Sequence, residues 1–185
     1  KVGRNNLLGV KQIVSKWDEN FVTKGWNTWF LTNHDHSRAV SKFGNDAPEY
    51  RDASAKMLYT FLLTQRALPY LYNGDEIGMT NIRFKNIEQY NDLQTRNRYY
   101  LALKESKEKA AAYLLNQQEL SRDNGRTPMQ WNTSANAGFT TGKPWLPVND
   151  NYKTTTNVVV QDTSANSILN FVRKMVKLRK ENKDV

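Results

Sequence analysis

The chain of 185 residues contains no cysteine and only two histidines. The absence of cysteine excludes disulfide bonds and metal sites built from thiolates, although it fixes no cellular compartment. No stretch approaches the ~20 apolar residues of a membrane span, so we expect no membrane partner. Hydrophobic residues make up 38% and aromatic residues 11% of the chain, which indicates a globular protein with one ordinary buried core.

The chain is strongly basic, with a formal net charge of +9 and a pI of about 9.7. A basic surface is the commonest sign of nucleic-acid binding but also the least specific one. Here the basic residues are scattered: "KESKEK" mixes charges at helical spacing, and "VRKMVKLRK" places its cations on the outer face of an amphipathic helix. We therefore expect no nucleic-acid partner.

Hydrophobic periodicity predicts helices and short strands in alternation up to residue 74. The expected elements are a helix over 6–22, a strand over 27–33, a helix over 47–65 and a strand over 68–73. Asp46 is placed to cap the second helix, and Pro48 suits its first turn. This order of helix, strand, helix and strand is typical of parallel α/β proteins.

The pattern changes over residues 75–166, which are polar and punctuated by Gly, Pro and Trp, with one or two helices around "IEQYNDLQTRNRYYLALKESKEKAAAYLL". A connection of this length is expected to be a functional excursion or a subdomain. Helical periodicity returns over 167–182, so the chain divides into segments 1–74, 75–166 and 167–185. Because two strands do not form a stable parallel sheet alone, we expect the chain to be the last part of something larger.

Both histidines lie in "WFLTNHDHSRAV", with Asp35 between them. On a strand, His34 and His36 would share a face and could chelate one metal ion, but a third ligand would have to be a carboxylate. A second reading is a structural role, with these polar side chains hydrogen-bonded in the fold. We favour a ligand site, because α/β barrels build their active sites at the C-terminal ends of parallel strands.

Two acidic residues, Asp75 and Glu76, follow the second predicted strand in "YNGDEIGMTN". Adjacent strands lie about 4.8 Å apart, so Asp35 and one of these acids could form a carboxylate pair for glycoside hydrolysis. However, glycines flank the two acids, and acids in such turns often cap backbone amides. We favour the structural role.

Arginine and tryptophan recur further along, in "SRDNGRTPMQW" and "NAGFTTGKPWLPVN", between rigid Pro and Gly turns. Flat guanidinium and aromatic groups suit sugar rings and hydroxyls, but they suit ordinary subdomain packing equally well. The chemistry of these residues alone leaves the two readings open.

Three blocks, "FLTNHDHSRAVSKFGND", "LPYLYNGDEIGMTNIRF" and "RDNGRTPMQWNTSANAGFTTGKPWLPVNDNY", resemble the α-amylase superfamily, glycoside hydrolase family 13, in sequence, order and spacing. Within it, the chain is most similar to the oligo-1,6-glucosidase and α-glucosidase branch, which includes the sucrose isomerases and trehalulose synthases. The resemblance implies an α/β fold that is the C-terminal portion of a (β/α)₈ TIM barrel, from helix 6 to helix 8. In that barrel 6–22 is the sixth helix, 27–33 the seventh strand, 47–65 the seventh helix, 68–73 the eighth strand, 75–166 an elaborated loop and 167–182 the final helix.

The resemblance also implies roles for individual residues. "NHD" matches the family motif whose His and Asp hold the 2- and 3-hydroxyls of the glucosyl unit being cleaved. Asp35 would be the transition-state stabiliser and His34 its companion donor. Arg126 matches an arginine of the terminal-sugar pocket, and we expect His36 and Arg38 to bind substrate as well. No metal and no cofactor is implied.

The chain departs from the branch in two places. After "NHD" the branch usually has Gln or Asn and then Pro, whereas here His36 and Ser37 follow, on the leaving-group side of the site. Asp75 stands where Glu is usual, which favours a packing or capping role. The nucleophilic Asp and general-acid Glu of the family follow strands four and five, so both would lie upstream of Lys1.

The resemblance implies a fragment of a retaining exo-α-glucosidase that hydrolyses α-linked gluco-oligosaccharides. The expected partners are that substrate and the remainder of its own barrel, and the family favours a cytoplasmic location. Two alternatives stay open: a sucrose isomerase or trehalulose synthase of the same branch, and a catalytically silent barrel that acts as an interaction protein.

Overall fold

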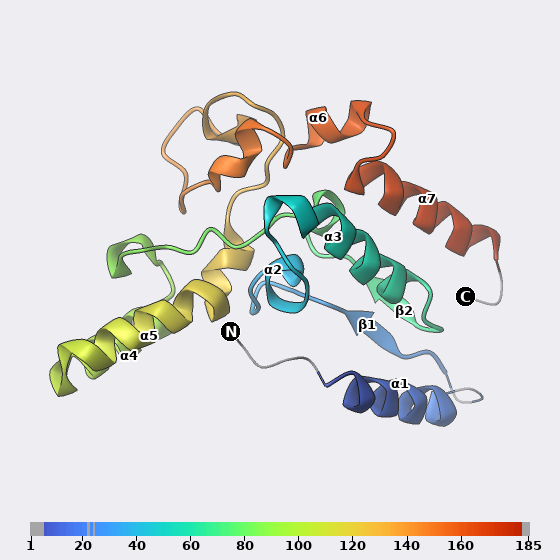
Figure 1. Ribbon diagram of the computed structural model, residues 1–185, viewed down its shortest axis with the longest axis horizontal. Coiled ribbons are helices and arrows are strands. Elements are labelled where there is room, and N and C mark those ends of the chain that lie inside the picture. Colours follow the sequence, from blue (N-terminus) through green and yellow to red (C-terminus); the bar gives the residue numbers. More distant parts are fainter. Residues whose placement is uncertain (1–5, 22, 24, 183–185) are drawn as a thin grey trace.

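The computed structural model describes residues 6–21, 23 and 25–182 (Figure 1). The end of the predicted first helix at residue 22, and the terminal residues 1–5 and 183–185 of the expected segments, lie outside this range. The helices and strands are α1 Leu7–Phe21, β1 Thr28–Phe30, α2 Ala39–Phe43, α3 Pro48–Leu63, β2 Leu68–Tyr70, α4 Leu93–Glu105, α5 Lys107–Leu120, α6 Val158–Thr163 and α7 Ile168–Glu181. The chain is therefore an α/β protein, as predicted, and α2 and α6 are short helices that periodicity did not reveal.

β1 and β2 pair in parallel, with Thr28 opposite Leu68 and Phe30 opposite Tyr70. The chain runs from one to the other through α2 and α3, as the parallel α/β pattern predicted. Each strand has only three residues, shorter than predicted from the apolar runs. Each has only one paired neighbour in the described structure, so the ladder ends early and the following residues turn away.

The main core joins α2, α3 and α7 against one side of the strand pair. Its buried side chains are Val40, Ala55, Tyr59, Leu62, Leu63, Ile168 and Val172. Trp29 of β1 packs against them from the sheet, and its ring meets Phe61 edge to face with centroids 5.9 Å apart. The apolar faces predicted for the second and last helices are thus the packed faces, except that Met57 points outward and is exposed.

The excursion over 75–166 packs around small apolar clusters of its own. One unites Ile77, Met79 and Met129 with Leu169 of α7, and another unites Phe84, Ile87, Tyr90 and Leu146. Within the excursion, α4 and α5 form a helical hairpin that projects away from the strands (Figure 1). The first cluster anchors the excursion to α7, and the second holds parts of the excursion together.

The apolar face of α1 is the exception to this packing. Val10, Ile13 and Trp17 have the predicted helical spacing, yet no described residue of α1 is buried. In Figure 1, α1 lies below β1 while α3 lies above it. Phe30 and Tyr70 of the strands are exposed in the same way, so large apolar side chains of α1 and of both strands remain open to solvent.

Asp46 does not cap α3 as predicted. The N-cap is Ala47, which makes no side-chain cap bond, although Pro48 occupies the first turn as expected. Asp46 instead accepts a hydrogen bond from the Ser41 hydroxyl and pairs with Arg83, whose Nη1 lies 2.8 Å from Oδ2. The Arg83 guanidinium brings a full positive charge, which a backbone N–H does not, and its contact fixes where the carboxylate points.

Candidate active site

The histidine segment forms a turn after β1 and not an extension of the strand. The Asn33 side chain accepts from the backbone N–H of Asp35 at 2.8 Å, and the His36 N–H donates to the Asn33 carbonyl at 3.1 Å. The alternation that would align His34 with His36 for a metal ion is therefore absent, because it requires an extended strand. His36 packs instead on Phe30, with ring centroids 6.4 Å apart. Within the described range, no group of three or more His, Asp or Glu residues is placed to hold a metal.

Asp35 is half exposed and lies between two guanidinium groups. Its Oδ1 accepts from Arg122 Nη1 at 3.2 Å and from Arg126 Nη2 at 3.1 Å. Its Oδ2 lies 3.4 Å from Nε2 of His34, and Arg126 also donates from Nε to the His34 carbonyl at 2.8 Å. Both residues of the predicted catalytic pair are thus held against the predicted sugar-binding arginine, Arg126.

Arg122 belongs to this cluster although the sequence did not single it out. It donates from Nε and Nη2 to Oδ1 of Asp92, at 2.9 and 2.7 Å, and keeps Nη1 for Asp35. "SRDNGR" drew attention for its two arginines, but residue chemistry offered no reason to prefer one of them. What distinguishes Arg122 is its contact with Asp92, which lies thirty residues earlier in sequence and could not be paired with it from sequence alone.

Two further carboxylates support the arginines from behind. Oδ2 of Asp92 caps α4 by accepting from the Thr95 N–H at 3.0 Å and its hydroxyl at 2.8 Å. Oδ2 of Asp123, which is buried, accepts from the backbone N–H groups of Asn91 and Asp92 at 2.8 Å each. Oδ1 of Asp123 lies 3.8 Å from Arg126 Nη1. The site is an alternating network of acids and arginines in which every arginine has an acid behind it.

The electrostatics keep Asp35 and Asp92 ionised. For both carboxyls desolvation is the largest single effect and opposes ionisation, but the hydrogen bond from Arg122 and the other favourable contacts outweigh it and lower the pKa. His36 behaves differently, because desolvation and then the charge of Lys42 lower its pKa. At neutral pH the site therefore presents carboxylate anions and an uncharged His36 ring.

Arg38 is fully buried, with 0% of its surface exposed. Its donors reach the backbone carbonyls of Asn73 at 2.5 Å, Asn124 at 3.1 Å and Thr127 at 3.3 Å, besides the Thr127 hydroxyl. The substrate contact predicted for Arg38 does not fit this placement, since its hydrogen-bonding groups are engaged and out of reach of solvent. Arg38 ties the histidine turn to the end of β2 and to the loop that carries Arg126.

The structural reading favoured for Asp75 and Glu76 agrees with their contacts. Asp75 accepts from the Tyr72 N–H at 3.0 Å and Glu76 from the Gly74 N–H at 2.9 Å. Asp75 is buried, which raises its pKa to about 7, and the Tyr59 hydroxyl donates to it. A buried carboxyl engaged in this way is not available to face Asp35 as a hydrolytic pair.

Trp145 settles how the second aromatic segment relates to the site. Its indole Nε1 donates to the Arg126 carbonyl at 2.9 Å, and its ring meets Phe139 edge to face at 4.8 Å. Of the two readings left open for this segment, sugar contact and packing, Trp145 has at least a packing role, because it fixes the backbone of Arg126. Its outer face is still exposed.

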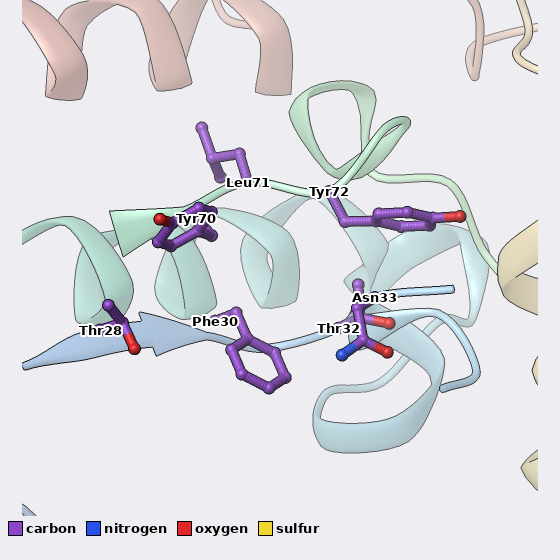
Figure 2. Close-up of a pocket in the computed structure, with 7 residues that line it drawn as sticks. All are labelled: Thr28, Phe30, Thr32, Asn33, Tyr70, Leu71 and Tyr72. Carbon is purple, nitrogen blue, oxygen red and sulfur yellow. The ribbon is translucent and has the colours of Figure 1, made fainter. Parts of the chain in front are cut away.

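Two cavities flank the turn. Figure 2 shows the first, of about 350 Å³, along the strand pair: Phe30 and Tyr70 project from β1 and β2, and Asn33 and Tyr72 lie beyond the strand ends. The second, of about 290 Å³, lies between Asp35, Arg122 and the hairpin of α4 and α5. Asp35 is thus accessible from solvent, at the C-terminal end of a parallel strand.

Comparisons with known proteins agree on one family. The model of the alpha-amylase catalytic domain matches residues 2–185. The oligo-1,6-glucosidase of Parageobacillus thermoglucosidasius is 47% identical over 95% of this chain and 31% of its own length. An α-glucosidase of Candida albicans is 46% identical over 88% of this chain and 30% of its own length.

Solved structures give the same result. The isomaltulose synthase of Klebsiella sp. LX3 is 46% identical with a TM-score of 0.87, covering 93% of this chain and 31% of that structure. A trehalulose synthase variant is 45% identical with a TM-score of 0.88 and the same coverage. No helix in the described ranges is long and apolar enough to cross a membrane. The chain spans about 31% of the length of the curated relatives it matches, and it belongs to the α-amylase family, within the catalytic domain.

Proposed function

We propose that the chain is the C-terminal part of the catalytic barrel of a retaining exo-α-glucosidase that acts on short α-linked gluco-oligosaccharides. In this proposal β1 and β2 are the seventh and eighth strands, α1 and α3 the sixth and seventh helices, and α7 the last helix. The parallel pairing of β1 with β2 and the position of Asp35 in the turn after β1 support this assignment.

The exposed apolar side chains support the remainder of the barrel as the partner of this chain. Ile13 and Trp17 of α1, and Phe30 and Tyr70 of the strands, are exposed here. In a closed barrel such side chains face other strands and helices, and each gains about 1.5–3 kcal/mol when fully buried. We therefore expect the remainder of the barrel to cover them.

Asp35 carries the mechanistic proposal. Both arginines contact its Oδ1, which leaves Oδ2, beside His34, to accept from a sugar hydroxyl. When the glycosidic bond breaks, the glucosyl ring flattens toward an oxocarbenium ion, and hydrogen bonds to its 2-hydroxyl strengthen. An anion that tightens its contact only in the transition state lowers the barrier without holding the ground state more strongly. The single observation behind the proposal is this carboxylate, which Arg122 and Arg126 hold by Oδ1 while Oδ2 lies beside His34.

The other predicted contacts follow from the same geometry. Arg126 reaches the His34 carbonyl and Asp35 at once, so its guanidinium suits one wall of the terminal-sugar pocket. We extend this role to Arg122, which shares Asp35. His36 is uncharged and packed on Phe30, and it would meet the leaving-group side.

The remaining chemistry is assigned to another part of the barrel. Double displacement needs two carboxyl groups about 5 Å apart, and Asp75, the acid at the end of β2, is buried and engaged. We expect the nucleophile and the general acid to come from earlier strands. The test is the intact parent enzyme with isomaltose, maltose and sucrose: release of glucose is expected, and its absence on all three sugars would overturn the proposal.

Isomerisation is the second candidate, because an isomaltulose synthase and a trehalulose synthase match at 45–46% identity. Chromatography of the sugars formed from sucrose separates the two. Glucose and fructose are expected from hydrolysis, whereas isomaltulose or trehalulose would favour isomerisation. A catalytically silent barrel is the third candidate, and it is dismissed if the parent sequence contains the upstream nucleophile and acid.

A further inference from the structure

We propose that Asp92 is a positioning residue that holds Arg122 side-on, so that Arg122 gives only one N–H group to Asp35 and leaves the second carboxylate oxygen of Asp35 open for substrate. The inference rests on the proposed role of Asp35 and adds a residue to the same site. It concerns a side chain that lies on the hairpin of α4 and α5, outside the strands that form the barrel.

The geometry of Arg122 carries the first step. Two of its nitrogens, Nε and Nη2, converge on Oδ1 of Asp92 at 2.9 and 2.7 Å, whereas only Nη1 reaches Asp35, at 3.2 Å. A guanidinium and a carboxylate normally prefer a two-pronged contact. Asp92 takes both donors of the Nε–Nη2 edge on its Oδ1, and this contact orients the guanidinium so that only Nη1 reaches Asp35, at Oδ1.

Burial carries the second step. The side chain of Asp92 is 5% exposed, against 51% for Asp35. Water screens an ion pair less when one partner is buried, so the contact of Arg122 with Asp92 is the stronger of the two. Arg122 therefore follows Asp92, and its contact with Asp35 is the adjustable one.

The support behind Asp92 carries the third step. Its backbone N–H donates to Asp123, and its second carboxylate oxygen caps α4 through Thr95. Backbone, cap oxygen and arginine-binding oxygen are all engaged, so Asp92 cannot move without disturbing α4. The hairpin of α4 and α5 thereby sets the position of a charge at Asp35.

Asp92→Asn separates this role from helix capping. Asparagine caps helices as well as aspartate does, so the start of α4 is kept while the charge that holds Arg122 is removed. Arg122 then turns both prongs onto Asp35 and occupies the oxygen that the sugar needs. We expect kcat/KM of the intact parent to fall roughly 10- to 100-fold, in the range of couplings between directly paired side chains. The effect on kcat should exceed the effect on KM, because the blocked oxygen is the one whose contact tightens in the transition state.

A matched control is Asp46→Asn. Asp46 is also largely buried, at 16% side-chain exposure, and also pairs with an arginine, Arg83, but it lies outside this network. It loses the same charge, so a general effect of weakening a buried ion pair would appear in it too. We expect its kcat/KM to stay within about twofold of wild type, as for a change that affects stability alone.

The experiment is a double-mutant cycle in the intact parent with Asp92→Asn, Arg122→Met and both together, followed by kinetics on an α-glucoside and by urea unfolding. With Arg122 absent, Asp92→Asn should add less than about a twofold further loss of kcat/KM. Independent, additive losses, or an equal loss in Asp46→Asn, would overturn the inference. If the wild-type parent hydrolyses no α-glucoside, the proposed function fails. The unfolding cycle then decides the inference: non-additive unfolding energies support the hold of Asp92 on Arg122, and additive ones overturn it.

Discussion

Gly125 lies directly against the backbone carbonyl of His36: a Cβ atom at position 125 would be 2.4 Å from that oxygen. The loop that carries Arg122 and Arg126 can approach the histidine turn this closely only because the position has no side chain. The contact joins the two halves of the site at their backbones.

Gly125→Ala in the intact parent should therefore push the arginine loop away from Asp35. Overpacking of this kind costs about 1–3 kcal/mol, so we expect a lower melting temperature together with a fall in kcat/KM. Gly142→Ala is the control, because a Cβ there meets its nearest atom, the Thr140 hydroxyl oxygen, at an ordinary 3.7 Å. Equal behaviour of the two variants would contradict the steric argument.

Asp35→Asn should lower kcat of the parent far more than it weakens substrate binding. The loss we expect is roughly 10²–10⁴-fold in rate, because the contact to the sugar tightens mainly in the transition state. Steady-state kinetics separates kcat from KM, and Asp150→Asn, an exposed acid paired with Lys153, controls for loss of a surface charge. A kcat within a few-fold of wild type would return His34 and Asp35 to a structural role.

Asp75 should make the parent less stable as the pH rises. Its pKa is raised to about 7 by burial in the fold, against about 3.9 in an unfolded chain. The folded state therefore holds a proton that the unfolded state releases between these values. Stability that depends on this proton is complete below about pH 4 and is lost as the pH rises through 7, by about 1.4 kcal/mol per unit in between.

Urea unfolding of the parent and of Asp75→Asn between pH 5 and 8 measures this effect. Asparagine does not titrate, so the unfolding free energy of wild type minus that of the variant should fall across this range. Other groups titrate in both proteins and cancel in the difference. A difference that is flat or rises with pH would show that Asp75 stays ionised in the fold.

The 185-residue chain taken alone should hydrolyse no α-glucoside and should self-associate. Its apolar strand and helix faces, with Trp17, Phe30 and Tyr70 exposed, offer a surface that a second copy can cover. Light scattering after size exclusion and a chromogenic α-glucoside assay test both expectations. A monomer that turns over substrate would contradict the assignment of the remaining catalytic acids to another part of the barrel.

The helices and the parallel order were predictable because they depend on local periodicity. Ile168 and Val172 are buried at the spacing that defines the face of α7. The lengths of the strands were not predictable, since a strand ends where its pairing with the neighbouring strand ends. The sequence after Phe30 does not show whether the neighbouring strand is still paired there. Asp46 was misassigned because an arginine 37 residues away offers it a better partner than the helix start.

In the candidate site too, local features of the sequence were predictable and long-range contacts were not. Asp35 and His34 were found because their motif is contiguous in sequence. Arg122 and Asp92 were missed because their meaning comes from a contact between two loops. Arg38, three residues after Asp35, was expected to bind substrate, yet its side chain is buried. Proximity in sequence to a reactive residue therefore gave no information about the direction of the side chain.

The buried position of Arg38 has a consequence for how freely this region can change in evolution or by design. Its hydrogen bonds reach 35, 86 and 89 residues along the chain, so the turn after β1 and the middle of the long excursion share one cation. Trimming the excursion to a short connection would remove carbonyl partners and leave a guanidinium in an apolar interior, which costs several kcal/mol. Between these fixed points, insertions and deletions should be tolerated best at the connection between α4 and α5, away from Asp92 and Glu119, which make long-range contacts at the other ends of these helices. Grafting the excursion onto another barrel would require the arginine to travel with it.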